Sequence, residues 1–214
     1  MHVRIKICGI TNPTDAEQAA ALGADAIGLN FYAKSPRCVD LARAAAILNV
    51  LPPFVEPVAL FVDEPITQVL QVILPLGIHS IQLYGDYRDP LPPSRRRGWI
   101  AAYSVRDAIS LALIDEDLAR MGTPPAAILV DAHVPGMFGG TGQVAPWQLL
   151  ATYRPRVPLI LAGGLTPENV GEAIRMVRPY AVDVASGVES SPGKKDVDKM
   201  RRFIDAVKSS SVEP

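Results

Sequence analysis

Cysteine is scarce in this sequence, charge is balanced, and long apolar runs are missing. The two cysteines, Cys8 and Cys38, are too few for the disulfide framework of a small secreted protein, so we expect free thiols. The formal net charge of -1 does not indicate a nucleic-acid partner. No apolar run approaches the ~20 residues of a membrane span, and the first predicted strand starts too early to leave room for a signal peptide. We therefore expect a cytoplasmic protein with no membrane or nucleic-acid partner.

The sequence alternates short β-branched runs with amphipathic stretches of helical length, and this alternation occurs eight times. The predicted strands are Val3–Cys8, Ala24–Phe31, Pro57–Val62, Ser80–Tyr84, Trp99–Ser104, Ala126–Asp131, Pro158–Ala162 and Ala181–Ala185. Helices are predicted over Pro13–Leu22, Asp40–Val50, Pro65–Leu76, the arginine-bearing stretch after Tyr84, part of Val105–Met121, Pro146–Tyr153, Pro167–Val177 and Asp196–Lys208. Eight such units predict an α/β fold, a single-domain (β/α)₈ TIM barrel over residues 1–208, followed by a frayed tail over 209–214.

A doubly wound open sheet is the alternative architecture. That fold usually has fewer strands and carries a glycine-rich fingerprint after the first one. Here the first strand is followed by Cys8-Gly9-Ile10-Thr11, which does not match the fingerprint. The barrel is therefore the better interpretation.

Two glycine-containing segments follow the seventh and eighth predicted strands. They are Gly163-Gly164, before a helix expected to open at Pro167, and Ser186-Gly187, before a possible short helical turn. Glycine lets an anion approach the backbone, and helix N-termini favour negative charge. Either segment alone would suggest an ordinary turn, but two in adjacent units favour a phosphate site.

Cys8 and Asp131 end the first and sixth predicted strands, where side chains can face the mouth of a barrel. A thiol can serve as a base or nucleophile if Lys6 or Arg37 lowers its pKa. A partly desolvated carboxyl has a raised pKa that suits a general acid. The alternatives are a small buried hydrophobe at Cys8 and a loop-capping carboxylate at Asp131.

Other polar residues carry weaker signals. Arg37 could bind a substrate carboxylate or lie in solvent. Asp183 falls inside the eighth strand and is interpreted as a structural carboxylate. The three histidines His2, His79 and His133 lack metal-ligand spacing, so we predict no metal site.

Seven short blocks of sequence resemble the phosphoribosylanthranilate isomerase family. They are Lys6-Ile-Cys-Gly-Ile-Thr11, Gly28-Leu-Asn-Phe-Tyr32 with Lys34-Ser-Pro-Arg37, Gln82-Leu-Tyr-Gly85, Val130-Asp131, Gly139-Gly-Thr-Gly142, Leu161-Ala-Gly-Gly-Leu-Thr-Pro-Glu-Asn-Val170 and Asp183-Val-Ala-Ser-Gly-Val-Glu189. Their order and spacing extend over nearly the whole chain. The resemblance implies a barrel enzyme of tryptophan biosynthesis.

The resemblance implies an Amadori rearrangement of N-(5-phosphoribosyl)anthranilate to 1-(o-carboxyphenylamino)-1-deoxyribulose 5-phosphate, without a cofactor. It assigns Cys8 as general base and Asp131 as general acid. It also implies that Arg37 binds the anthranilate carboxylate and that the Gly139–Gly142 loop folds over the ligand. The substrate-binding residues implied in this way are Arg37, Gln82, Gly140, Gly163, Gly164, Ser186 and Gly187.

The sequence departs from the family pattern at two positions. Tyr84 stands where a histidine is usual, and Gln143 follows the glycine loop where a lysine is common. A phenol does not titrate near neutral pH, so we expect no acid–base role at Tyr84 and at most altered affinity from either departure.

Two other functions remain possible from the sequence. A related phosphosugar isomerase of histidine biosynthesis is expected to use an aspartate where Cys8 stands. A non-catalytic barrel that binds a phosphate ligand would not need both Cys8 and Asp131. The sequence does not define an oligomeric state.

Overall fold

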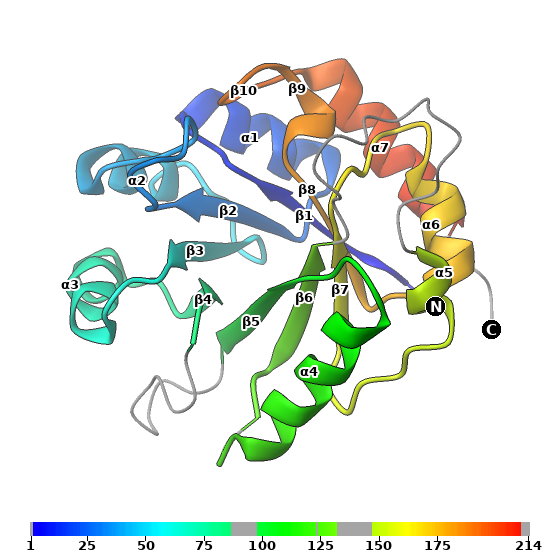
Figure 1. Ribbon diagram of the computed structural model, residues 1–214. Helices are drawn as coiled ribbons and strands as arrows, with labels where there is room; N and C mark the ends of the chain where they lie inside the picture. Colours follow the sequence, from blue (N-terminus) through cyan, green and yellow to red (C-terminus); the bar gives the residue numbers. More distant parts are fainter. Residues whose placement is uncertain (1, 87–97, 123, 132–146, 211–214) are drawn as a thin grey trace.

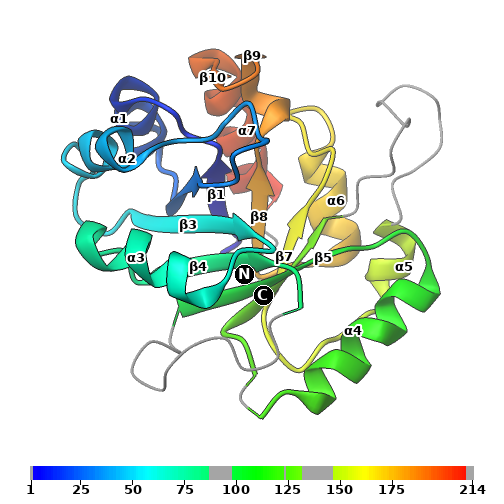
Figure 2. The ribbon, with the colours of Figure 1, turned by 60° about the vertical axis from the view of Figure 1, so that its left-hand side comes forward.

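The computed structural model describes residues 2–86, 98–122, 124–131 and 147–210, and it forms a closed barrel (Figures 1 and 2). Its strands are β1 (Arg4–Cys8), β2 (Ala26–Asn30), β3 (Glu56–Val62), β4 (Ser80–Tyr84), β5 (Trp99–Ser104), β6 (Ala127–Asp131), β7 (Leu159–Ala162) and β8 (Ala181–Val184). Each strand pairs in parallel with the next, and β8 pairs with β1. The predicted eight-stranded barrel is confirmed.

Helices cover the outside of the strands (Figure 1). They are α1 (Pro13–Leu22), α2 (Leu41–Leu48), α3 (Ile66–Leu76), α4 (Ala108–Arg120), α5 (Trp147–Ala151), α6 (Val170–Val177) and α7 (Val197–Ser210). Between β8 and α7 the chain forms a 3₁₀ turn, η2 (Ser186–Val188), and a small antiparallel hairpin of β9 (Glu189–Ser191) and β10 (Lys194–Lys195). The hairpin lies beyond the carboxyl end of β8, at the top of Figure 2.

Local sequence signals set the ends of α1. The Asn12 side chain accepts a hydrogen bond from the Asp15 N–H at 2.9 Å, and Pro13 occupies the first turn, as predicted. Gly23 ends the helix with φ 101°, a left-handed conformation that glycine adopts without steric cost.

Strand alternation separates two apolar clusters. In β1, Ile5 and Ile7 are buried in the large cluster between sheet and helices, whereas Lys6 and Cys8 point to the other face. A second, smaller cluster fills part of the barrel interior and contains Val58, Ile100, Ala102, Ala127, Leu129, Ile160, Ala162 and Ala181. The interior next to β1 is therefore left to polar side chains.

Several element boundaries differ from the sequence-based prediction by one to three residues. Helix α6 begins at Val170 rather than Pro167, because Thr166 and Asn169 form side-chain hydrogen bonds that hold a turn. Helix α5 is shorter than expected and ends at Ala151. Helix α7 continues two residues past the predicted boundary, to Ser210. The helix expected after Tyr84 lies outside the described residues.

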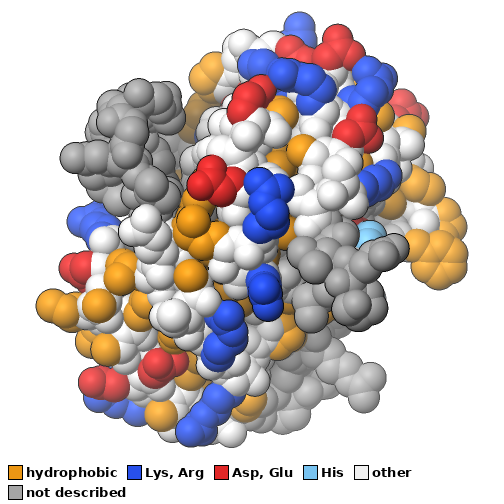
Figure 3. All heavy atoms as spheres, turned by 90° about the vertical axis from the view of Figure 1, so that its right-hand side faces the viewer, with side chains coloured by type: hydrophobic (Ala, Val, Ile, Leu, Met, Phe, Trp, Pro, Cys, Tyr) orange, Lys and Arg blue, Asp and Glu red, His pale blue; other side chains and the backbone are white. Residues whose placement is uncertain are grey.

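The surface over α5, α6 and α7 carries side chains of both charges (Figure 3). Exposed ion pairs there join Arg201 to Asp198 and Arg202 to Glu168. Within the described ranges, no helix combines the length and apolar character needed to cross a membrane, and no cluster of three or more His, Cys, Asp or Glu side chains could hold a metal ion.

Candidate active site

A cavity of about 640 Å³ opens at the carboxyl ends of the strands. In parallel barrels this is the end at which strand-terminal side chains converge. The cavity brings together most of the predicted site residues, namely Cys8, Arg37, Gln82, Asp131, Gly163, Gly164, Ser186 and Gly187. Gly140 and the rest of the Gly139–Gly142 loop lie outside the described residues, as do Gln143 and His133.

Cys8 lies at one side of the cavity with only 6% of its surface exposed. Lys6, two residues earlier on the same strand face, donates a hydrogen bond from Nζ to Asp183 Oδ1 at 2.8 Å. Burial raises the pKa of the Cys8 thiol, and the Lys6 ammonium opposes this shift without overcoming it. The net direction in this cavity is thus opposite to the lowering predicted from nearby cations.

The Lys6–Asp183 ion pair is itself buried, with residue exposures of 4% and 8%. Although burial favours the neutral amine, the Asp183 carboxylate and Cys8 raise the pKa of Lys6. Asp183 had been predicted as a structural carboxylate, and it does form this ion pair. It also lines the cavity, which the sequence alone did not indicate.

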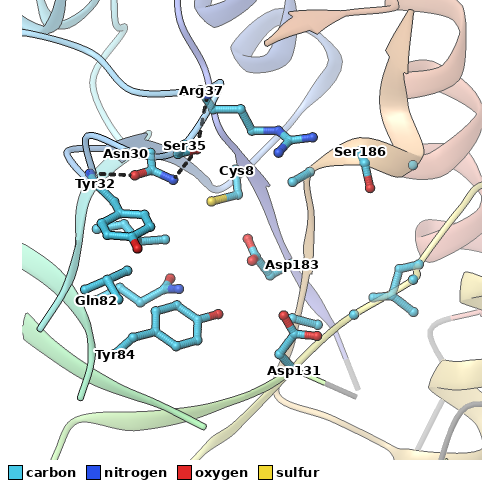
Figure 4. Close-up of a pocket in the computed structure, with 18 of the residues that line it drawn as sticks. Cys8, Asn30, Tyr32, Ser35, Arg37, Gln82, Tyr84, Asp131, Asp183 and Ser186 are labelled. Atoms are coloured by element: carbon cyan, nitrogen blue, oxygen red, sulfur yellow. Dashed lines mark hydrogen bonds between the residues drawn. The ribbon is translucent and has the colours of Figure 1, made fainter. Parts of the chain in front are cut away.

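Asp131 ends β6 and lines the same cavity as Cys8. Figure 4 shows its carboxyl and the Cys8 sulfur entering the same space from different strands, with Asp183 between them. Asp131 is partly exposed, as expected for a group at the mouth. The two side chains are therefore placed to act on different atoms of one ligand.

Arg37 reaches the cavity from the loop after β2, and its guanidinium pairs with Glu189 of β9. Nε and Nη2 donate to the two carboxylate oxygens at 2.8 and 2.7 Å. Lys195 Nζ donates to the same Glu189 carboxylate and to the Ala185 carbonyl oxygen, both at 3.0 Å. Glu189 therefore holds two cations beside the cavity.

Burial and ion pairing have opposite effects on the pKa values of Glu189 and Lys195. Burial opposes the charged form of Glu189, but hydrogen bonds from Arg37 and the charge of Lys195 lower its pKa below the ordinary value. Burial lowers the pKa of Lys195, and Glu189 opposes that shift. Because one edge of the Arg37 guanidinium already binds Glu189, a ligand carboxylate would have to use the other edge.

The β2–α2 loop is held in shape by its own polar side chains. Asn30 Oδ1 accepts from the Tyr32 N–H at 2.8 Å, and Asn30 Nδ2 donates to Ser35 Oγ at 3.1 Å. Ser35 Oγ also accepts from the Arg37 N–H at 3.1 Å, and these bonds are drawn in Figure 4. They fix the position from which Arg37 enters the cavity.

The two glycine segments lie against each other at the end of β7 and β8. Gly163 and Gly164 have φ of 91° and 65°, so both need a residue that tolerates the left-handed region. A Cβ added to Gly187 would overlap the Leu165 carbonyl oxygen. Ser186 and Gly187 belong to η2, the short helical turn that the sequence suggested. Backbone from both loops therefore forms one concave wall.

Gln82 and Tyr84 come from β4 and face the same cavity. Gln82 is fully buried, and neither atom of its side-chain amide has a hydrogen-bond partner. Burial raises the pKa of the Tyr84 hydroxyl far above its usual range, and the charge of Asp131 adds to the effect. Tyr84 is accordingly a neutral phenol, as predicted.

Comparison with known proteins decides the family. The family model described as N-(5'phosphoribosyl)anthranilate (PRA) isomerase matches residues 5–206. An N-(5'-phosphoribosyl)anthranilate isomerase of Pseudomonas aeruginosa (strain LESB58) is 47% identical over 209 residues, covering 97% of this chain and 96% of that protein. The chain belongs to the phosphoribosylanthranilate isomerase family.

Solved structures of the family have the same barrel. Phosphoribosyl anthranilate isomerase from Thermotoga maritima superposes with a TM-score of 0.83 at 40% identity, covering 97% of this chain and 99% of that one. A phosphoribosyl anthranilate isomerase in complex with reduced 1-(o-carboxyphenylamino)-1-deoxyribulose 5-phosphate superposes with a TM-score of 0.80 at 39% identity, with the same coverage. The resemblance inferred from seven sequence blocks is confirmed.

Sequence analysis missed part of the site of this family member. Glu189 and Lys195 follow the last barrel strand in a hairpin that period-two or helical patterns do not reveal. Only 7% of Glu189 and 4% of Lys195 is exposed, which is unusual for charged residues. This burial points to a role, and it can be seen only in the folded structure. Within the sequence, Glu189 ends a block that resembles the family, which was the available hint.

Proposed function

We propose that this protein isomerises N-(5-phosphoribosyl)anthranilate, with Cys8 as general base and Asp131 as general acid, in the cytoplasmic synthesis of tryptophan. The observation that carries the proposal is one cavity lined by a thiol from β1, a carboxyl from β6 and the glycine segments after β7 and β8. Family membership supports the same activity. The net reaction is an isomerisation by proton transfer, so it requires no external oxidant, reductant or group donor.

The chemistry begins at Asp131, which donates its proton to the furanose ring oxygen. The C1–O bond breaks, and the nitrogen lone pair forms the C1=N bond of a protonated Schiff base. Cys8, as the thiolate, then removes the C2 proton, the C–H electrons form the C1=C2 bond of an enolamine, and the C1=N π electrons return to nitrogen. Tautomerisation gives the ketone. Placement of the acid and the base on different strands suits two proton transfers at different atoms.

Binding groups distant from the reacting atoms position the substrate. The phosphate is proposed to bind the backbone at Gly163, Gly164, Ser186 and Gly187. The glycines and the short helical turn η2 leave room for an anion to approach main-chain N–H groups. The free edge of Arg37 is proposed to bind the anthranilate carboxylate. The unpartnered Gln82 amide would gain hydrogen bonds from a bound sugar hydroxyl, which offsets its burial.

An anthranilate-fluorescence assay tests the activity directly. Purified protein is mixed with phosphoribosylanthranilate, and we expect its fluorescence to decrease with time at a rate proportional to enzyme concentration. Inorganic phosphate should inhibit competitively by binding at the glycine segments. Unchanged fluorescence together with retained phosphate binding would support the non-catalytic binding barrel instead. Turnover of the histidine-pathway aminoaldose alone would support that isomerase.

Gln82 offers a sharper test of substrate positioning. Replacing it by methionine removes both amide atoms but keeps a side chain of similar length in a fully buried site. We expect kcat/KM to fall by roughly tenfold or more, through lost hydrogen bonds to the substrate, with thermal stability unchanged or higher because a buried unpaired amide is removed. Unchanged kcat/KM would rule out the proposed contact.

A further inference from the structure

Lys6 is the cation next to the thiol, and its place in the barrel is unusual. Its side chain points into the interior, where only 4% of the residue is exposed, rather than to solvent. A buried lysine is costly unless it is paired, and here Asp183 Oδ1 accepts a hydrogen bond from Lys6 Nζ at 2.8 Å. The strands of the pair are adjacent, since Lys6 and Asp183 are register partners.

Gly28 shows how close Lys6 and Cys8 come. It faces Cys8 in the register of β1 and β2. A Cβ added to Gly28 would lie 2.6 Å from Cys8 Sγ and 3.1 Å from Lys6 Nζ, so the thiol and the ammonium both border the space that the missing side chain leaves. Gly28 is not among the glycines with positive φ. The glycine is therefore required here for space and not for backbone conformation.

Other charged groups around Cys8 are already engaged. Lys195 from β10 and Arg37 from the β2–α2 loop both pair with Glu189 of β9. Asp183 from β8 is the anion that raises the pKa of Cys8, and Asp131 and the neutral Tyr84 line the same cavity. Among the cations, Lys6 has the largest stabilising effect on the thiolate, ahead of Lys195.

We propose that Lys6 is a positioning residue of the isomerase, that its ammonium is the counter-charge of the Cys8 thiolate, and that Gly28 preserves the space for this contact. The proposal rests on the proposed function. Asp183 has the complementary role: when Cys8 is a neutral thiol, Asp183 keeps the Lys6 charge paired. When the thiolate takes the C2 proton it becomes a thiol, Lys6 keeps its own proton, and the ion pair with Asp183 remains.

Titration of the Cys8 thiol tests this proposal without substrate. In a Cys38→Ser background, which leaves one thiol, the pH dependence of Cys8 alkylation by iodoacetamide gives the midpoint of its ionisation. Thiolate ultraviolet absorbance provides a second measurement that does not depend on reagent access. We expect Lys6→Met to move the midpoint upward by about 1 pH unit or more, and Lys6→Arg to restore most of the shift.

The matched variant is Asp183→Asn, which breaks the same ion pair from the other side. Because Asp183 disfavours the thiolate, we expect its removal to move the midpoint downward, opposite to Lys6→Met. If the ion pair is purely structural, the Cys8 midpoint should move in the same direction in both variants, and that result would overturn the proposal.

If a single variant does not fold, the double variant Lys6→Met/Asp183→Asn removes both charges and keeps the interior neutral. Its midpoint should still lie above that of the parent, and an equal midpoint would also overturn the proposal.

Turnover gives an independent readout. With phosphoribosylanthranilate, Lys6→Met should lower kcat by roughly tenfold or more at neutral pH with KM nearly unchanged, and raising the pH should recover part of the loss. Loss that appears only in KM would contradict the role. If the parent protein shows no turnover, the proposed function fails, but the thiol titration still decides whether Lys6 stabilises the thiolate.

Discussion

Apart from Asp131 at the mouth, an apolar cluster fills the β5, β6 and β7 side of the barrel interior, whereas the β1 and β8 side contains a buried ion pair. The first side is filled by Ile100, Ala102, Leu129, Ile160 and Ala162, all in one cluster. The second contains the Lys6–Asp183 ion pair next to Cys8. Both sides are comparably buried, so solvent exposure does not explain the difference.

The proposed roles of Cys8 and Lys6 give this contrast a physical reason. Apolar residues of matching volume often stabilise a protein as much as a buried ion pair or more, because two charges need not be desolvated. The apolar side follows that rule. The charged side departs from it where the thiol lies, which is expected when an interior must hold a reactive anion. Variants on each side should therefore change different properties.

The largest expected effect is on catalysis at the charged side. Cys8→Ser should lower kcat by roughly 10² to 10⁴, because the hydroxyl is a far weaker base at neutral pH, while ligand affinity stays close to normal. Single-turnover fluorescence and inhibition by phosphate measure the two properties separately. A near-normal kcat would remove Cys8 as the base. Asp131→Asn is the companion variant, and lost affinity with normal kcat would make Asp131 a binding residue.

Next in size is the stability cost of breaking the ion pair. Lys6→Met alone should destabilise the fold by about 3 to 5 kcal/mol, because it leaves the buried Asp183 carboxylate unpaired. Lys6→Met/Asp183→Asn should recover most of that loss. Urea unfolding of the parent, both single variants and the double variant gives the coupling free energy. Additive effects would show that the two charges do not interact, and the contrast between the two sides would lose its basis.

On the apolar side, Leu129→Ala should cost about 2 to 5 kcal/mol of stability by leaving a cavity at a fully buried position. Its effect on the ionisation midpoint of Cys8 should be negligible, since no charge changes. The milder Ile160→Val should cost about 0.5 to 1.5 kcal/mol and serves as the graded control. A shift of the Cys8 midpoint in either variant would mean that the two sides are not separable.

The smallest expected effect concerns acid. Folding lowers the pKa of Glu189 from its ordinary value of 4.5, so its stabilising contribution is fully present above that value and is lost as the pH falls through the lower folded-state value. The difference in melting temperature between the parent and Glu189→Gln should therefore be constant near neutral pH and shrink below about pH 4.5. A difference that does not depend on pH would contradict the ionised Glu189 pair.

Much of the fold was predictable because its units are local. The alternation of strand and helix patterns gave the eight strands, and Asn12-Pro13 gave the start of α1. The start of α6 was wrong by three residues, because hydrogen bonds from the Thr166 and Asn169 side chains compete with the first helical turn. Such competition depends on side-chain geometry that a periodic pattern does not contain.

Only those residues of the candidate site that lie at the ends of strands could be predicted from the sequence. Cys8, Asp131 and the glycine segments could be found in this way, because every strand of a parallel barrel presents its carboxyl end to one mouth. Glu189 and Lys195 could not, since their importance comes from burial beside Arg37 after the last strand. The direction of the Cys8 pKa was also missed, because desolvation depends on the packed surroundings of the thiol.

By itself the sequence determined the barrel, the family and the side chains available for proton transfer, since these follow from local periodicity and from short blocks of residues. Only the tertiary structure decided which of those side chains act together. Lys6, Cys8 and Gly28 lie on the consecutive strands β1 and β2, and Asp183 of β8 joins them only because the barrel closes between β8 and β1. Electrostatic effects between buried groups depend on distance and desolvation, and neither exists until the chain has folded.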